Sequence, residues 1–471
     1  MGKWKENEVN FSPTMPTKTS SNLCASNIVV KFLVFTLLIA AIVPSLNIPS
    51  IFLTFLPEIC EQQDPTTAAP TYWIPDDGYH LQVVHKIFHS FGFKKFLGKN
   101  SWDVFWSSRY PFDDCRNWFQ NLKPNQKVNH VPGIYFLTSK VELSMTDADF
   151  IPKSFRIPED MEELRNYSSK NPGYRFLIKG NTHRNIEMVN VDDIDVTSSE
   201  SFIQKFVDNP FLVDGHKFDF GVYTIITSVD PLRAYIYNGD VMMRYCLQKY
   251  YPFNESVLDK YVLSSNYIPT QEMPALKPYF NNFGYNMRDS FNAYVKSKGL
   301  CPKTIWEEVE SIISNILVLV KNFEVTRNFF ELVRFDFVVD ETLKVFLLEV
   351  NMSPNLSPIT MEFNRALYEQ VVLSVFKLVG IERYKFNMNS PNSTLNKNIF
   401  VNPETCSSKE CLNSCDQKIC SLCYQYLTLD DIEDLNMAYE EHINQGDYWN
   451  GVIRRISEEV FAQKSAGHQM V

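Results

Sequence analysis

The sequence predicts an α+β fold in which antiparallel hairpins and helices form layers around a cleft. From about residue 128, short apolar runs alternate with longer helical stretches. The alternation and β-branched content of 220–227 and 344–350 are typical of strands. By contrast, 305–321 and 362–379 have the periodicity of amphipathic helices. Strands and helices mixed in this order favour an α+β architecture.

Length and composition set the broad class. A chain of 471 residues is long enough for two or three folded units. Its 45% hydrophobic and 14% aromatic residues are those of a folded protein. The formal net charge of −10 disfavours a nucleic-acid binder, because such proteins need a basic face. A local basic groove for an acidic peptide remains compatible with this charge.

Residues 28–46 predict a single membrane-spanning helix. The stretch IVVKFLVFTLLIAAIVPSL is apolar and has about the length needed to cross a bilayer. Lysines precede it or lie near its start, and the next Lys or Arg after it is Lys86. The positive-inside rule therefore places the N-terminus in the cytosol, a type II orientation, and the rest in the lumen or outside the cell. A cleaved signal peptide and a buried soluble helix are the alternatives.

Half of the cysteines crowd into one short segment near the C-terminus: Cys406, Cys411, Cys415, Cys420 and Cys423. Their spacing is not a standard paired zinc arrangement. Disulfides formed in an oxidising compartment are the first interpretation, in agreement with the predicted orientation. A zinc knot and unbonded thiols remain open.

Composition shifts divide the chain into five parts. The predicted parts are a cytosolic tail (1–27), a transmembrane signal anchor (28–46), a stalk with a small N-terminal region (47–125), a main domain of strands and helices (126–385) and a Cys-rich segment with an acidic helical tail (386–471).

The clearest chemical signal is the segment 328–358, NFFELVRFDFVVDETLKVFLLEVNMSPNLSP. Two strands flank a polar turn, so they should pair as a hairpin. Alternation places Glu349 and Asn351 on one face, and a turn near Thr342 places Asp336 opposite Glu349. Oxygen donors of this kind suit a hard cation such as Mg²⁺. The alternative is a carboxylate at a sheet edge, but one buried in such an apolar run is costly without a partner.

Two further segments carry charge at strand ends. The strand 175–179 ends at Lys179 and precedes a polar turn, which suits contact with phosphates. Lys217, Arg233 and Arg244 are spread through a hairpin region and could line a groove for an anion. Charged residues at strand ends are also commonly just solvated, and no glycine-rich phosphate loop is present.

Taken in order, these segments resemble the tubulin–tyrosine ligase-like family over roughly residues 128–379. NHVPGIYFLTSKVEL resembles the family's opening motif and FIPKSFRIP its next one. The stretch QKFVDNPFLVDGHKFDFGVYTIITSVDPLRAYIY follows the family pattern closely. DFVVD followed by LLEVNMSPNL resembles its metal-binding segment. The ordered set is more specific than any one motif.

The resemblance implies an ATP-grasp-like domain that holds ATP between two subdomains. It also implies roles for individual residues. Mg²⁺ would be held by Asp336, Glu349 and Asn351; ATP would be contacted by Lys179, Gln204, Lys205, Phe206, Val207, Lys217, Asp219 and Asn266; and Arg244 and Arg184 would be catalytic, with Arg244 receiving the acceptor peptide.

Two departures from the family pattern stand out. The phosphate loop is shortened to GNTHRNI, in which Arg184 would supply charge in place of backbone amides. The family's arginine two residues after the KFD aspartate, which would stabilise the γ-phosphate, is Gly221 here.

The implied activity is ATP-dependent ligation of glutamate to a side-chain carboxylate of tubulin, through an acyl phosphate. The alternatives are a catalytically impaired domain that binds nucleotide or a partner, and a ligase for a luminal protein. The predicted orientation places the domain away from cytosolic microtubules, so acceptor and topology are separate expectations.

Overall fold

The computed structural model describes most of one compact unit of the chain, Thr67–Val471. The described residues are 69–75, 78–96, 98, 102–180, 186–194, 201–322, 327–359, 361–382, 406–413, 420 and 423–451. The predicted anchor 28–46 and Arg184 lie outside them. Within the described ranges, no helix combines the length and apolar character that crossing a membrane requires.

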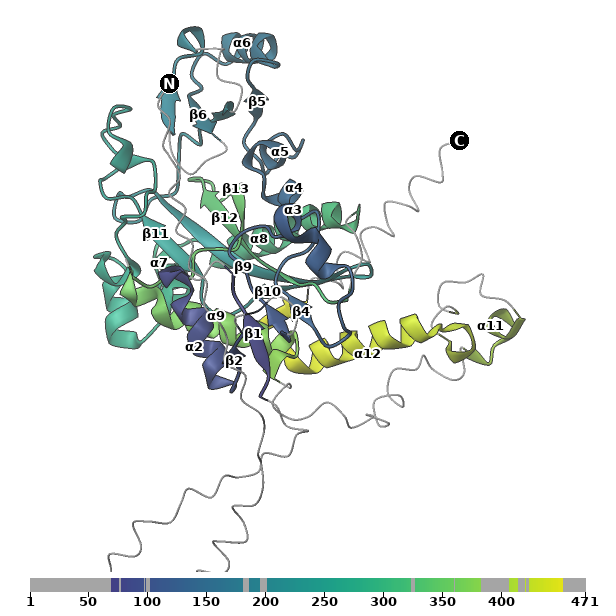
Figure 1. Ribbon diagram of the computed structural model, residues 1–471. Helices are drawn as coiled ribbons and strands as arrows, with labels where there is room; N and C mark the ends of the chain where they lie inside the picture. The colour runs from purple at the N-terminus through teal and green to yellow at the C-terminus, as the bar shows by residue number, and fades with distance from the viewer. Residues whose placement is uncertain are drawn as a thin grey trace, which may run out of the picture. The chain divides into compact units, whose positions relative to one another are not determined.

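A six-stranded main sheet forms the centre of the unit (Figure 1). Its strands are β9 (Phe218–Val229), β10 (Leu232–Tyr237), β11 (Met242–Tyr245), β12 (Glu331–Val339), β13 (Val345–Met352) and β14 (Trp449–Gly451). The order is β13-β12-β9-β10-β14, and β11 pairs with the first residues of β9 beyond the end of β10. All these pairings are antiparallel.

The two faces of the main sheet differ in polarity because side chains alternate along each strand. On one face, Phe220 packs against Phe337 and against Trp306 of α8 (Pro302–Leu317), with ring centroids 5.5 and 5.3 Å apart. Helix α7 (Met287–Ser297) covers the same face through Phe291. The other face carries the charged side chains of β9, β11, β12 and β13. This polar face is the one available to a ligand.

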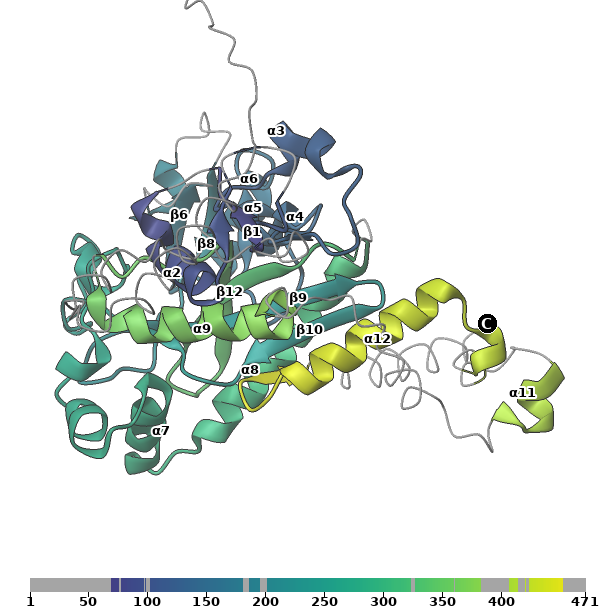
Figure 2. The same cartoon turned by 60° about the horizontal axis from the view of Figure 1, so that its bottom comes forward.

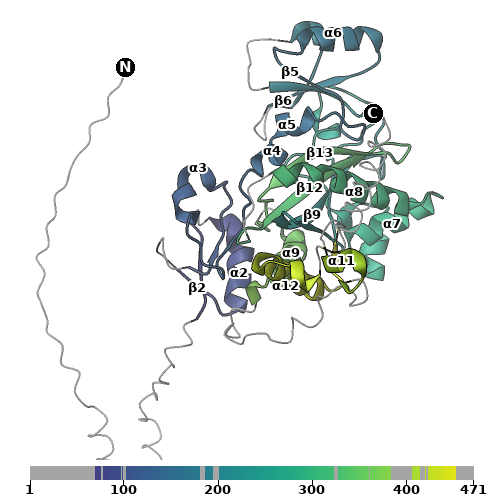
Figure 3. The same cartoon turned by 90° about the vertical axis from the view of Figure 1, so that its right-hand side faces the viewer.

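A smaller antiparallel sheet stands at one end of the main sheet (Figures 1 and 3). Its order is β5-β8-β6-β7, formed by β5 (Ser154–Arg156), β6 (Phe176–Gly180), β7 (Glu187–Val189) and β8 (Ser201–Lys205). Helix α6 (Met161–Lys170) packs on it through Leu164. The short helices α4 (Tyr135–Thr138) and α5 (Lys140–Ser144) connect it with β13.

The N-terminal part of the described chain forms a four-stranded parallel sheet. Its order is β2-β1-β3-β4, with β1 (Thr71–Trp73), β2 (Lys94–Lys95), β3 (Val104–Phe105) and β4 (Lys127–Val128), and helix α3 (Phe112–Cys115) follows β3. Helix α2 (Gln82–Ser90) packs on α9 (Arg365–Leu378), with the rings of Phe88 and Phe376 4.5 Å apart. This sheet therefore shares one apolar core with the main sheet.

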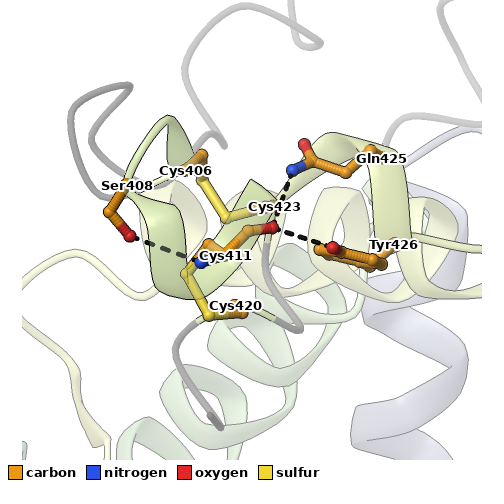
Figure 4. Close-up of a disulfide and its surroundings, with 7 residues drawn as sticks. All are labelled: Cys406, Ser408, Cys411, Cys420, Cys423, Gln425 and Tyr426. Carbon is orange, nitrogen blue, oxygen red and sulfur yellow. Dashed lines mark hydrogen bonds between the residues drawn. A yellow bond between two sulfur atoms is a disulfide. The ribbon is translucent and has the colours of Figure 1, made fainter. Parts of the chain in front are cut away.

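Near the C-terminus, two disulfides link Cys406 to Cys423 and Cys411 to Cys420 (Figure 4). Cys411 lies in the short helix α11 (Lys409–Asn413). The Tyr426 hydroxyl donates a hydrogen bond to the Cys411 carbonyl at 2.8 Å. The disulfide interpretation of this cysteine cluster is confirmed for these four residues. Cys415 lies outside the described part of the chain.

Helix α12 (Leu429–Asn444) and β14 then return to the main sheet. The helix contacts α9 (Figure 2), and β14 extends the sheet by pairing with β10. On the inner side of α12, one carboxylate oxygen of Glu441 accepts from Arg233, Thr227 and Tyr235 at 3.0, 2.8 and 2.9 Å. We call this contact, made by Glu441 with these three side chains, the α12 dock.

The predicted hairpin is confirmed in its register, since Asp336 pairs with Glu349. A backbone turn at 340–344 closes it, with Leu343 at a φ of 70°. In the described part of the C-terminal tail, the helix ends at Asn444, and the chain then turns and adds β14 to the sheet.

Candidate active site

The polar face of the main sheet lines a cleft of about 960 Å³, and the small sheet contributes its other wall. More basic than acidic side chains line this cleft. The basic ones are Lys140, Lys179, Lys205, Lys217, Arg244 and Arg334, and the acidic ones are Asp219, Asp336 and Glu349. In a chain with a net charge of −10, this local excess of cations favours an anionic ligand.

Two carboxylates and an amide meet on the floor of the cleft. The amide nitrogen of Asn351 lies 3.0 Å from Asp336 Oδ2 and 3.1 Å from Glu349 Oε1. The three side chains are therefore close enough to share one ion. In the described residues, no three His, Cys, Asp or Glu side chains gather in a metal-binding arrangement. The donors here, with waters and phosphate oxygens, nevertheless fit the hard, oxygen-rich coordination of Mg²⁺.

Lys140 of α5 pairs with Glu349 from above the floor. Its Nζ lies 2.9 Å from Glu349 Oε2. Burial alone would raise the pKa of Glu349. The Lys140 ammonium and the Asn351 hydrogen bond outweigh burial and hold that pKa well below its usual range. Glu349 therefore stays ionised, as a cation ligand must.

Two guanidinium groups surround Asp336. Arg244 of β11 donates to both oxygens of Asp219 at 2.7 Å and to Asp336 at 3.0 Å. Arg334 of β12 donates to both oxygens of Asp336, at 2.6 and 2.7 Å. Burial raises the pKa of Asp219, with Arg244 opposing that rise. The floor is thus a network of paired charges whose geometry is fixed by four neighbouring strands.

Lys179 and Gln204 face the floor from the small sheet. Lys179 Nζ donates to Gln204 Oε1 at 2.6 Å, and Gln204 Nε2 donates to Ser154 Oγ at 3.1 Å. Burial lowers the pKa of Lys179 to about 8, although Glu349 acts in the opposite direction. A bound anion would favour the charged form of this lysine.

The strand that carries Gln204 runs on into the cleft wall. Phe206 is buried and packs on Tyr261 with a centroid separation of 5.7 Å, and Val207 also lines the cleft. The Lys205 ammonium lies 3.7 Å from the centre of the Tyr174 ring. Lys217, directly before β9, is buried and lines the same cleft.

Two of the residues singled out from the sequence, Asn266 and Arg233, are not brought to the cleft floor. Asn266 is exposed, although Ser265 and Tyr267 beside it line the cleft. Arg184 lies outside the described residues. Arg233, expected in the same groove as Arg244, instead points to the α12 dock. Its strand pairs with the distal half of β9, so its side chain is remote from the end of β9 that bears Asp219.

Sequence reasoning assigned no role to Lys140 or to Arg334. Lys140 lies in the motif NHVPGIYFLTSKVEL, but nothing there indicates that it reaches Glu349. Arg334 gave a clearer signal, because an arginine inside the buried strand ELVRFDFVV needs a partner on the same face. Its neighbour at that spacing is Asp336.

The chain matches known proteins over this region. Residues 119–390 match the model of the Tubulin-tyrosine ligase family. A Caenorhabditis elegans protein named "Probable tubulin polyglutamylase ttll-15" is 37% identical over 394 residues, 78% of this chain and 76% of that protein. The tubulin polyglutamylase TTLL6 of Mus musculus is 27% identical over 58% of this chain. The human tubulin monoglutamylase TTLL4 is 25% identical over 62%.

The last two matches cover only 36% and 25% of those longer relatives. The family match, however, takes in both walls of the cleft and all the floor residues described above. This chain belongs to the tubulin-tyrosine ligase family.

Proposed function

We propose that this chain is an ATP-dependent ligase that adds glutamate to a side-chain carboxylate of tubulin, using an ATP-grasp cleft. The observation that carries the proposal is the convergence of Asp336, Glu349 and Asn351 beneath a cation-rich cleft, within the family-matched segment. The names of the relatives support glutamate as donor and tubulin as acceptor.

Each wall of the cleft has its own task in this proposal. Asp336, Glu349 and Asn351 hold Mg²⁺, which neutralises phosphate charge when bound. Lys179 contacts phosphates from the small sheet. Other residues would bind the nucleotide: Gln204, Lys205, Phe206 and Val207 beside the base, and Lys217, Asp219 and Asn266 elsewhere along it.

The reaction is a transfer in two steps. The acceptor carboxylate attacks the γ-phosphate, forming an acyl phosphate and releasing ADP. The glutamate amine then attacks the acyl carbon and displaces phosphate, leaving an amide bond. Arg244, and Arg184 from the short loop, supply positive charge for the acceptor and the transferring group. Catalysis of this kind rests mainly on positioning and charge neutralisation.

Incorporation of labelled glutamate into tubulin tests the proposal. The full-length chain, ATP and Mg²⁺ are expected to label tubulin, and omitting ATP or Mg²⁺ abolishes the signal. Glu341 lies on the exposed turn of the β12–β13 hairpin. Glu341→Gln is therefore expected to retain activity, and it is the matched control for the same substitution at Glu349. Absence of labelling by a folded chain that binds nucleotide would contradict the ligase assignment.

A second candidate is a nucleotide-binding protein without ligase activity. Gly221 favours it, because the family position that bears the γ-phosphate arginine has no side chain here. The same assay separates the two: nucleotide binding without glutamate transfer supports the second candidate alone.

The acceptor could instead be a luminal protein. The two disulfides favour an oxidising compartment, and the lysines before residues 28–46 favour a type II anchor. Protection of the C-terminal part from protease in intact microsomes would place the cleft in the lumen, away from microtubules. Digestion without detergent would favour tubulin.

A further inference from the structure

Gly221 on β9 faces the cleft, and its missing side chain leaves space that Arg334 fills. A Cβ at position 221 would lie 2.6 Å from Arg334 Cδ, 2.8 Å from its Nε and 2.9 Å from Asp336 Oδ1. Such distances are too short for real contacts, so a side chain at 221 and Arg334 in this position exclude each other. Because φ at Gly221 is not in the left-handed region, close approach explains the glycine.

Strand register explains how Arg334 reaches this space. Asp336 pairs with Gly221, and Arg334 is two residues earlier on the same face of β12. The Arg334 side chain lies along its own strand toward Asp336 and donates hydrogen bonds to both carboxylate oxygens. Its guanidinium therefore lies over β9 at position 221, although it comes from β12.

Arg334 keeps donor capacity for an anion in the cleft. The side chain is nearly fully buried yet lines the cavity, and its Nη1 lies 3.5 Å from the sulfur of Met242, a weak acceptor. Asp336 meanwhile receives donors from Arg334, Arg244 and Asn351. Asp336 and Asp219 together face two guanidiniums, those of Arg334 and Arg244, and both arginines line the cleft, where they can donate to a phosphate.

We infer that Arg334 contacts the terminal phosphate of ATP, supplying from β12 the cation that the family resemblance expects at position 221 of β9. The inference rests on the proposed function. A guanidinium at this point donates to γ-phosphoryl oxygens, which ATP has and ADP lacks. Arg334 therefore sets the preference for ATP over ADP.

Nucleotide binding to the full-length chain tests this without reference to turnover. Dissociation constants are measured with Mg²⁺ for ADP and for a non-hydrolysable ATP analogue. Arg334→Gln keeps a hydrogen-bonding side chain but removes the charge. It is expected to weaken binding of the ATP analogue, relative to ADP, by about tenfold or more. Arg233→Gln removes a buried arginine from the same sheet but outside the cleft, and leaves the ratio unchanged.

An exchange of the two residues provides a second test. Gly221→Arg alone is expected to lower the melting temperature, because it collides with Arg334. The double variant Gly221→Arg with Arg334→Gly carries the arginine on β9 in place of β12. It is expected to keep the preference for the ATP analogue over ADP. A double variant that melts like the wild type but shows no preference would overturn the inference.

The outcomes for the two proposals are distinct. If the wild-type chain binds neither nucleotide, the proposed function fails. If it binds both, and Arg334→Gln weakens both equally, Arg334 only braces Asp336 and the inference alone fails.

Discussion

The cleft and the α12 dock are built on the same sheet, and both contain buried arginine–carboxylate pairs. In the dock, Glu441 meets one arginine and two hydroxyl groups, and its charge is fully matched. In the cleft, more cations than carboxylates surround an open space. The comparison teaches that a buried ion pair does not by itself identify a site. What distinguishes the cleft as a candidate site is the excess of positive charge beside a cavity.

The largest expected effect is on the cleft floor. Glu349→Gln removes one of the two carboxylates available to Mg²⁺, and glutamate incorporation is expected to fall by at least about 100-fold. Thermal stability should fall by less than at the dock, because the variant removes the carboxylate that pairs with Lys140 but both side chains are partly exposed. Unchanged incorporation would show that the floor is not a metal site, and the cleft would then resemble the dock.

The opposite result is expected at the dock. Glu441→Gln leaves Arg233 buried without a counter-charge, and the free energy of unfolding should fall by about 3 kcal/mol or more. Chemical denaturation measures this change. Glu433 also lies on α12, and Glu433→Gln breaks a more exposed pair with Arg327, so it should cost about 1 kcal/mol or less. If Glu441→Gln and Glu433→Gln lowered the free energy of unfolding equally, the buried pair of the dock would be no more stabilising than an exposed pair.

A pH dependence is expected on the cleft side. Burial lowers the pKa of Lys179 to about 8, whereas an unfolded lysine titrates near 10.5. Between these values the unfolded chain binds more protons, so the Lys179 contribution to stability increases with pH. Nucleotide binding favours the charged form of Lys179. Above pH 8 the protein should therefore take up a proton when it binds ATP, and its ATP affinity should fall as the pH rises.

Calorimetry at pH 9 in buffers of different ionisation enthalpy measures that uptake. Lys179→Arg stays charged and should bind ATP without it. Proton uptake that persists in Lys179→Arg would assign the effect to another group.

The smallest effect is expected from the disulfides. Their cysteines form a cluster of their own, apart from the cleft residues. Reduction of both bonds should therefore change nucleotide affinity by less than about twofold, as distant sites act independently. A larger loss on titration with a reductant would show that the C-terminal segment is coupled to the cleft.

The sequence predicted the local geometry of the floor but not its contacts across the fold. Strand alternation was enough to pair Asp336 with Glu349, because the hairpin is local and its turn fixes the register. Lys140 and Arg233 depend on long-range packing, which one sequence does not reveal. The sequence favoured a cleft position for Arg233, but its partner, Glu441, lies on α12, 208 residues later in the chain.

The predicted element types hold wherever one periodicity dominates, as in α8 and β9. The small parallel sheet was harder to predict, since strands of two or three residues carry too few positions for a pattern. The relation of Gly221 to Arg334 needed coordinates, because it depends on which side chain fills a gap left by another strand.

The position of β14 has a consequence for synthesis of the protein. Arg233 of β10 and its partner Glu441 are 208 residues apart, so the edge of β10 leaves the ribosome long before α12 and β14 can cover it. Throughout that interval an unpaired strand edge and an uncompensated Arg233 stay open to wrong partners. Nascent or C-terminally truncated chains should therefore be the species that chaperones hold and that aggregate first.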